Sequence, residues 1–181
     1  ENQETKARFV RVQILNRAEY LSLAEVQVFS GGKNVAVKKR ATQSSNYSGG
    51  GAAGLGVDGN TNGDFSKAKS TTHTEMQDNP WWMVDLGKSF SIEKIVIWNR
   101  TQGGEGISGR LRGFRVEALD DSKKTVWRED VKQSFPVKKA FATGTLPADL
   151  LATVKLPASK RNKSQAAKLT EYFIASTGEL L

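Results

Sequence analysis

The segment from Val57 to Asp64 carries the side chains best suited to binding a cation. It reads Val-Asp-Gly-Asn-Thr-Asn-Gly-Asp, so carboxylate and amide oxygens alternate with residues that allow a tight turn. Such a loop can surround a hard cation with carboxylate, amide and backbone carbonyl ligands, as calcium requires. The same residues form Asx turns without any ion. From the residues alone, a calcium site and a plain turn both remain open.

The single histidine and three arginines form a second group of candidates. His73 stands in the polar run 70–75, and Arg100, Arg110 and Arg112 flank a glycine-rich stretch. A lone histidine is more often a structural hydrogen-bonding group than a ligand-binding one. Each arginine taken singly fits either a solvated face or a clamp for phosphate or carboxylate.

Catalysis has little support in this inventory. A nucleophilic triad needs a histidine that is held by a partner and lies next to a serine, and this chain has one His and no Cys. The adjacent carboxylates Asp120–Asp121 and Glu129–Asp130 have the character of turn and surface residues. We therefore expect a protein that is not an enzyme.

Composition excludes several further classes. The chain has 181 residues and a formal net charge of +8, and the absence of Cys removes disulfide frameworks, thiolate zinc sites and iron–sulfur clusters. The densest basic cluster of the front part, 37–40, has no interleaved aromatic residues, so we expect a solvated strand edge and no nucleic-acid partner. No apolar run of about 18 residues is present, and no signal segment opens the chain.

Short alternating segments must position these candidate residues. From Arg8 to about Trp127 apolar and polar residues alternate with period two between clusters of Gly, Asn, Ser and Asp, which is typical of an all-β sandwich or barrel. Two long irregular stretches, 44–78 and 99–109, hold the polar candidates, as functional loops do. The expected strands lie around Val10–Ile14, Val26–Val28, Trp82–Leu86, Glu93–Trp98, Phe114–Ala118 and Lys124–Trp127.

The end of the chain has a different pattern. Pro147 opens a short predicted helix, and Ala166, Leu169, Tyr172 and Phe173 recur at helical spacing. We therefore predict two parts, a β-sandwich over residues 1–143 and a helical tail over 144–181. The tail would belong to a linker or a following module.

An ordered series of short motifs resembles the F-type (fucose-binding) lectins, which belong to the discoidin or coagulation factor type C superfamily. The resemblance covers roughly residues 8–137 and implies a jelly-roll-like antiparallel β-sandwich. The motifs are Gln43-Ser44-Ser45, Val57-Asp58-Gly59-Asn60, Thr72-His73-Thr74, Asn79-Pro80-Trp81-Trp82, Val84-Asp85-Leu86-Gly87, Ile97-Trp98-Asn99-Arg100, Arg110-Leu111 and Gly113-Phe114.

The resemblance also implies a sugar site. In the family a His, 26 further residues and an Arg precede a second Arg, and here 26 residues separate His73 from Arg100. His73, Arg100 and Arg110 inherit the suggested role of holding a fucose. Gln102 stands where the family motif has an Asp, nine residues separate the two arginines, and glycines 103 and 104 replace the family's adjacent cysteines.

A structural calcium ion is the implied cofactor. The resemblance gives Asp58, Asn60, Ser70 and Glu25 as side-chain ligands, with backbone carbonyls from Leu55 and Ala24. Glu25 lies in the segment 21–26, which in the family is a last strand. We predict that this strand is permuted and closes its own sandwich from the N-terminal side. The alternative, that residues 1–30 end a preceding repeat, would leave 31–137 without a full sheet.

These inferences combine into one expected function. We expect a non-catalytic module that binds a glycan or polysaccharide, fucose-like or related, through a shallow His/Arg site and that is stabilised by calcium. A looser resemblance to modules of large planctomycete-type proteins implies an extracytoplasmic location and other modules of a larger parent chain as partners; a membrane partner is not expected. The alternative is a structural or protein-interaction module whose sugar site is degenerate.

Overall fold

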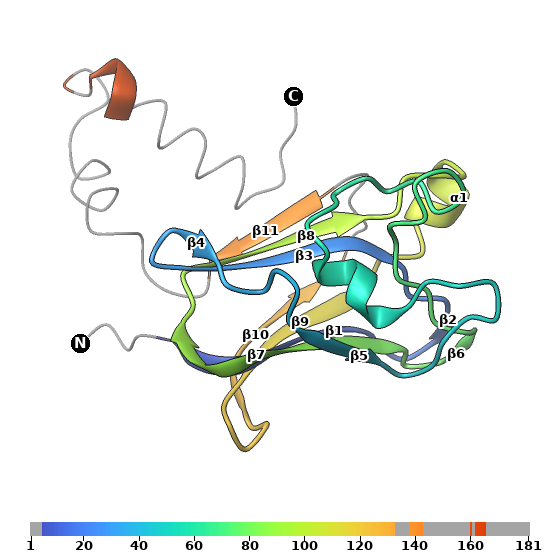
Figure 1. Cartoon of the computed structure of the whole chain (residues 1–181), viewed down its shortest axis with the longest axis horizontal. Coiled ribbons are helices and arrows are strands. Elements are labelled where there is room, and N and C mark those ends of the chain that lie inside the picture. The colour runs from blue at the N-terminus through green and yellow to red at the C-terminus, as the bar shows by residue number, and fades with distance from the viewer. Residues whose placement is uncertain (1–4, 133–137, 143–159, 161, 166–181) are drawn as a thin grey trace.

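The computed structural model describes residues 5–132, 138–142, 160 and 162–165 (Figure 1). Two antiparallel sheets face each other in this part of the chain (Figure 1). The first has the order β10-β9-β1-β7-β5 and the second β11-β8-β3-β4. Their strands are β1 (Lys6–Ile14), β3 (Leu23–Ser30), β4 (Lys33–Asn34), β5 (Arg40–Gln43), β7 (Trp81–Ser91), β8 (Lys94–Asn99), β9 (Phe114–Leu119), β10 (Thr125–Val131) and β11 (Lys138–Ala142).

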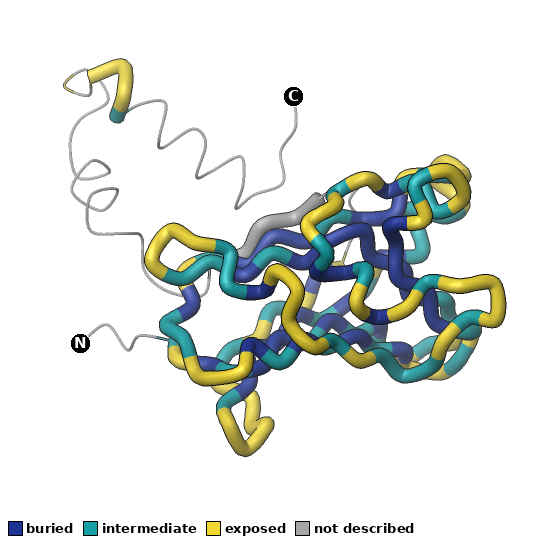
Figure 2. Tube along the Cα trace, in the orientation of Figure 1, coloured by how far each residue is buried: buried dark blue, intermediate teal, exposed yellow. Residues whose placement is uncertain are grey.

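The period-two pattern predicted this β-sandwich, and the structure confirms it. In β1 the side chains of Val10, Val12 and Ile14 are fully buried between the sheets, while the intervening residues face outward and are only partly covered. Alternating side chains of a strand point to opposite faces, so one apolar face per strand suffices to build the core. Figure 2 shows the buried residues as the dark blue interior segments of both sheets.

Trp82 links the first sheet to the loops above it. Its ring is fully buried, and its Nε1 donates a hydrogen bond of 2.9 Å to the carbonyl of Ala53 in the 3-10 helix η1 (Ala53–Val57). Its neighbour Trp81 lies on the opposite face of β7 and is only half-buried. The Trp pair is therefore divided between the core and the outer face.

Strand β3 occupies the position predicted for it. It pairs antiparallel with β8, with Val26 opposite Ile97 and Val28 opposite Ile95. This N-terminal strand therefore completes the second sheet of its own sandwich. The register shifts between Leu23 and Glu25, which makes Ala24 the extra residue of a bulge.

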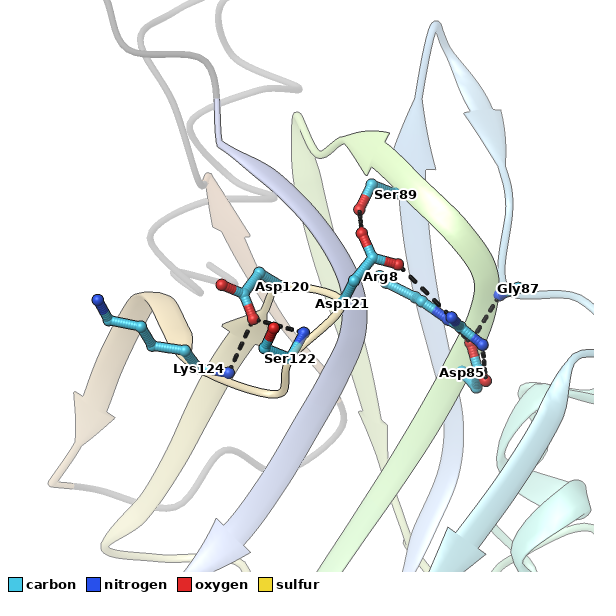
Figure 3. A network of polar contacts seen from close by, with 8 residues as sticks. All are labelled: Arg8, Asp85, Gly87, Ser89, Asp120, Asp121, Ser122 and Lys124. Atoms are coloured by element: carbon cyan, nitrogen blue, oxygen red, sulfur yellow. Dashed lines mark hydrogen bonds and ion pairs between the residues drawn. The ribbon is translucent and has the colours of Figure 1, made fainter.

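A polar network fastens one end of the first sheet (Figure 3). Arg8 of β1 holds Asp85 of β7 with two hydrogen bonds, from Nε at 2.8 Å and from Nη2 at 2.9 Å. Ser89 donates to Asp121 at 2.6 Å, so the turn between β9 and β10 is tied to β7 as well. The Arg8 side chain lowers the pKa of Asp85 by this hydrogen bond and its charge. The network is structural and lies away from the candidate residues.

The candidate residues gather at one end of the sandwich. There the short strands β2 (Ala18–Glu19) and β6 (Gln77–Asp78) pair, and the helix α1 (Glu105–Ser108) lies in the second long loop (Figure 1). The two stretches expected to be irregular are so, apart from η1, β6 and α1. Among the described residues no helix is long and apolar enough to cross a membrane. Most of the predicted helical tail lies outside the described residues, and the division at residue 143 stays a prediction.

Candidate functional site

His73 is fixed by the backbone on either side of it. Thr72 and Thr74 donate backbone hydrogen bonds to the carbonyls of Leu23 and Leu21, at 2.8 and 3.0 Å. Their hydroxyl oxygens accept the N–H groups of the same two leucines at 2.9 Å. This threonine ladder explains the polar run 70–75, because buried backbone groups need partners where no regular strand supplies them. Histidine 73 is thereby held in an extended, buried segment.

Three aromatic rings surround the His73 imidazole. The ring stacks on Tyr47 with centroids 4.4 Å apart, and it meets Tyr20 and Phe65 in edge-to-face arrangements with centroids 5.3 Å apart in each case. Nδ1 lies 2.7 Å from the carbonyl of Thr74, so Nδ1 carries the proton, because a carbonyl can only accept. In the neutral ring Nε2 is then left as an acceptor.

Burial keeps this imidazole neutral. The side chain is 5% exposed, and this burial, followed by the charges of Arg100 and Arg110, lowers the pKa of His73. The hydrogen bond to Thr74 and the charge of Glu75 act in the opposite direction without reversing the shift. At neutral pH the site therefore offers an uncharged hydrogen-bond acceptor beside two cations.

Arg100 follows β8 and is almost as buried as His73, with 6% of its surface exposed. Its guanidinium carbon lies 4.4 Å from the centroid of Phe65, and its Nη2 donates to Oε1 of Gln102 at 3.0 Å. Within the described residues its buried Nε has no hydrogen-bond partner. Burial and the charge of Arg110 lower the pKa of Arg100. An unpartnered buried donor is costly, which makes this N–H a candidate for a ligand contact.

Arg110 approaches the same place from the connection between α1 and β9. Its guanidinium carbon lies 4.8 Å from the centroid of Tyr20, and its Nε lies 3.8 Å from Oε1 of Glu19. Gln102 lies between the two loops, since its Nε2 donates to Ser66 at 2.6 Å while its Oε1 receives Arg100. The structure thus brings all four predicted site residues together.

The close contact between two loops shapes the site. Gly63 accepts the backbone N–H of Thr101 at 3.0 Å and that of Gln102 at 3.3 Å. A Cβ at Gly63 would lie 2.7 Å from both the carbonyl of Asn99 and the nitrogen of Thr101, so only glycine permits this approach. The loop that carries Phe65 is therefore held against the loop that carries Arg100.

The aromatic residues are the part of the site that the sequence interpretation missed. Tyr20, Tyr47 and Phe65 stand in three separate polar stretches and belong to no alternating strand pattern. That misfit was the available signal, because an aromatic residue in a polar loop needs some partner to cover it.

The predicted calcium ligands centre on Glu25. Its carboxylate is fully buried, Oε2 accepts the Gly59 N–H at 3.3 Å, and Oε1 has no hydrogen-bond partner among the described residues. Burial, with a contribution from the charge of Asp58, raises the pKa of Glu25 to about 7. An orphaned buried carboxylate oxygen beside a second carboxylate fits a cation, since buried charges are ordinarily paired or bound to metal.

The remaining predicted ligands lie along the Asx-rich loop. Asp58 and Asn60 each accept a backbone N–H two residues on, at 2.7 and 3.0 Å, and buried Ser70 donates to the carbonyl of Asn62. The Asx turns are therefore present, and each side-chain oxygen keeps a lone pair for an ion. No cluster of three or more His, Cys, Asp or Glu that could hold a metal occurs in the described part of the chain. A cation here would depend on two carboxylates and neutral oxygens.

The two predicted carbonyl ligands, Leu55 and Ala24, lie on neighbouring elements. Leu55 lies in η1, which packs against β3, and Ala24 is the bulge residue of β3 next to Glu25. A bulge re-aims the backbone locally, which is consistent with a carbonyl that serves an ion rather than a regular ladder.

Comparison with known proteins gives the class of this module. Residues 55–146 match the family of NedA-like, galactose-binding domains of the F5/F8 type C group, so the chain belongs to that family. Fucolectin-1 of Anguilla japonica is 46% identical over 88 residues, which are 46% of this chain and 47% of that protein. The fucolectin of Anguilla anguilla is 43% identical over 82 residues, which are 42% of this chain and 51% of that protein. The chain thus spans about half the length of the curated relatives it matches.

Two solved structures share the fold. A mutant of the lectin binding domain of lectinolysin, complexed with Lewis b, has a TM-score of 0.57 and 36% identity, covering 64% of this chain and 81% of that one. A fucose binding module of Streptococcus pneumoniae has a TM-score of 0.57 and 31% identity, covering 62% and 80%. These relatives are lectins and lectin modules, a non-enzymatic class. The resemblance to F-type lectins and the predicted sandwich are confirmed.

Proposed function

We propose that this chain is a non-catalytic carbohydrate-binding module that holds a fucose-type sugar between His73, Arg100 and Arg110. The convergence of these three side chains, from three separate segments, carries the proposal. Relatives named as fucolectins and as a fucose binding module support the sugar class. The free sugar would bind weakly, because a shallow polar site gains little from burial.

The chemistry of the site suits vicinal hydroxyl groups. Nε2 of the neutral His73 would accept a hydrogen bond from a sugar hydroxyl, while Nε of Arg100 and the guanidinium of Arg110 would donate to hydroxyl or ring oxygens. Phe65 and Tyr47 hold the Arg100 and His73 planes in place, so little conformational entropy is lost on binding. Gln102 orients Arg100 in the role that a carboxylate would otherwise fill, with a neutral rather than a charge-assisted hydrogen bond.

A calcium ion completes the proposal. Glu25 and Asp58 would supply its carboxylate ligands, Asn60 and Ser70 neutral oxygens, and Leu55 and Ala24 backbone carbonyls. Bound calcium would supply positive charge that offsets the buried carboxylate. Its affinity would be limited by the small number of charged ligands. The residues present fit the ion, because one buried Glu25 oxygen has no hydrogen-bond partner in the part of the chain that the structure describes.

Weak binding by a single site suggests that the module works together with others on one parent chain. Useful retention on a polysaccharide would come from several modules on one parent chain, because linked sites raise the effective concentration. Other modules of such a chain are therefore the expected neighbours, and an extracytoplasmic location is where a glycan would be met.

A glycan array tests the proposal. The full chain is screened in calcium and again with excess chelator, beside His73→Ala and the distant surface variant Lys33→Ala as control. We expect retention on fucosylated glycans that is weakened by chelator, lost in His73→Ala and kept in Lys33→Ala. If the folded chain bound no glycan on the array, the result would contradict the proposal and favour a structural or protein-interaction module.

A further inference from the structure

Three arginines meet beside the proposed sugar site. Arg17, in the turn between β1 and β2, donates from Nη2 to the carbonyl of Arg110 at 2.7 Å. The same guanidinium lies along the backbone of residue 113, where its Nη1 is 3.2 Å from the position a Cβ would take. Arg112 lies between these points in the sequence and is exposed. The guanidinium of Arg17 therefore lies against the segment 110–113 that carries the other two arginines.

The positive charges of this cluster are poorly compensated. In the described part of the chain, the ion pair of this cluster joins Nε of Arg110 to Oε1 of Glu19 at 3.8 Å. Arg112 has no hydrogen bond or ion pair there, and the Nε of Arg17 is buried without a partner. Burial lowers the pKa of Arg17, and the charge of Arg112 lowers it further, while Glu19 opposes them. Like charges held together in this way are stabilised by an anion.

The cluster is continuous with the sugar site. Arg110 belongs to both, because its guanidinium covers Tyr20, whose ring centroid lies 5.3 Å from that of His73. Its charge also reaches Arg100 and His73, since it lowers the pKa of each. A glycan that extends from His73 past Arg110 would approach Arg17, which donates to the Arg110 carbonyl, and Arg112, whose charge acts on Arg17.

We propose that Arg17 and Arg112 form an acidic subsite, so that the preferred ligand is a glycan carrying a sulfate ester or a carboxylate next to the sugar held by His73 and Arg100. This inference rests on the proposed function of that site. Guanidinium groups bind sulfate and carboxylate oxygens through paired N–H donors, which a lysine cannot reproduce. Arg112 is exposed and has no hydrogen bond or ion pair among the described residues, so its guanidinium supplies such donors; the buried Nε of Arg17 is also unpartnered in that part of the chain.

Isothermal titration of the full chain in calcium tests the subsite. Three matched oligosaccharides are compared: a neutral fucosylated one, the same one with a sulfate ester, and the same one with a uronic carboxylate. Charged hydrogen bonds are stronger than neutral ones, so one or both acidic forms should bind about 10-fold more tightly than the neutral form. The oligosaccharide that binds more tightly than the neutral one identifies the anion that the subsite prefers.

Two variants separate a subsite from general attraction. Arg112→Gln removes one positive charge at the subsite, and Lys33→Gln removes one in the distant turn-forming strand β4 (Figure 1). We expect Arg112→Gln alone to lose the advantage of the acidic ligand, with neutral binding unchanged. The subsite would be overturned if both variants lost the same amount of affinity for the acidic ligand. It would also be overturned if the neutral ligand bound and neither acidic form bound more tightly. Failure of all three ligands to bind would overturn the proposed function itself.

Discussion

The guanidinium carbon of Arg100 lies 4.4 Å from the centroid of the Phe65 ring. This contact joins the end of a strand in the second sheet to the loop that follows the Asx-rich turns. Phe65 also packs edge-to-face with His73, with ring centroids 5.3 Å apart, so one ring contacts two of the three proposed sugar-binding side chains. The aromatic ring acts as a brace between the candidate calcium loop and the candidate sugar site.

Phe65→Ala should weaken sugar binding while the sandwich stays folded. A buried cation–π contact is worth about 2 kcal/mol, so the loss of this one should lower affinity for a fucosylated ligand by roughly 10-fold or more. Titration calorimetry measures the change, and Phe65→Tyr is the control that keeps the ring. Equal affinity of Phe65→Ala and the parent chain would contradict the bracing role.

Gly51→Ala should damage the site without replacing any of the proposed sugar-binding residues. Gly51 has φ +91, and a Cβ there would lie 2.5 Å from the Cβ of His73. Gly50, at φ +111, has nothing within 4 Å of such a Cβ, so Gly50→Ala carries a similar backbone strain and no clash. We expect lost sugar binding in Gly51→Ala and retained binding in Gly50→Ala, both read on a glycan column. The same binding by both variants would mean that the position of His73 does not matter.

Much of this arrangement was predictable from the sequence because it follows short periods or fixed spacings. Alternation of Val10, Val12 and Ile14 fixes which face of a strand is buried, and the strand of Glu25 was correctly assigned to its own sandwich. The aromatic surroundings of His73 were not predictable, because contacts between loops distant in sequence follow no period. The arginine cluster was missed for the same reason, since Arg17 meets Arg110 only after the sheets have formed.

The stability of the calcium-free protein should fall as the pH rises from about 5 to 8. The folded pKa of Glu25 is raised to about 7, so between the unfolded and folded values the folded state binds the extra proton. A rising pH then charges a buried carboxylate and lowers the melting temperature, and calcium should offset this most at pH 8.

Thermal melts in chelator and in calcium, at pH 5 and pH 8, measure this effect. Glu25→Gln should flatten the pH dependence and reduce the stabilisation by calcium, while Glu93→Gln in the exposed loop before β8 serves as control. Stabilisation by calcium that is the same at both pH values, or the same in Glu25→Gln, would remove Glu25 from the ion site.

The pKa of His73 should lie below its ordinary value of 6.5. Its pKa is lowered by burial and by the neighbouring arginines, so sugar binding should persist to mildly acidic pH and fail when the ring gains a proton. The chain has one histidine, so the imidazole signal in an NMR titration is unambiguous. A titration midpoint at or above pH 6.5 would show that the ring is not held as described here.

A sugar held between His73, Arg100 and Arg110 can be detected residue by residue in solution. The isotopically labelled chain is titrated with L-fucose in calcium, and amide and side-chain NMR shifts are followed. We expect shifts concentrated on these three residues and on Tyr47 and Phe65, and no such shifts when D-glucose is added instead. Shifts confined to the outer face of a sheet, or none at any sugar concentration, would contradict the proposed sugar site.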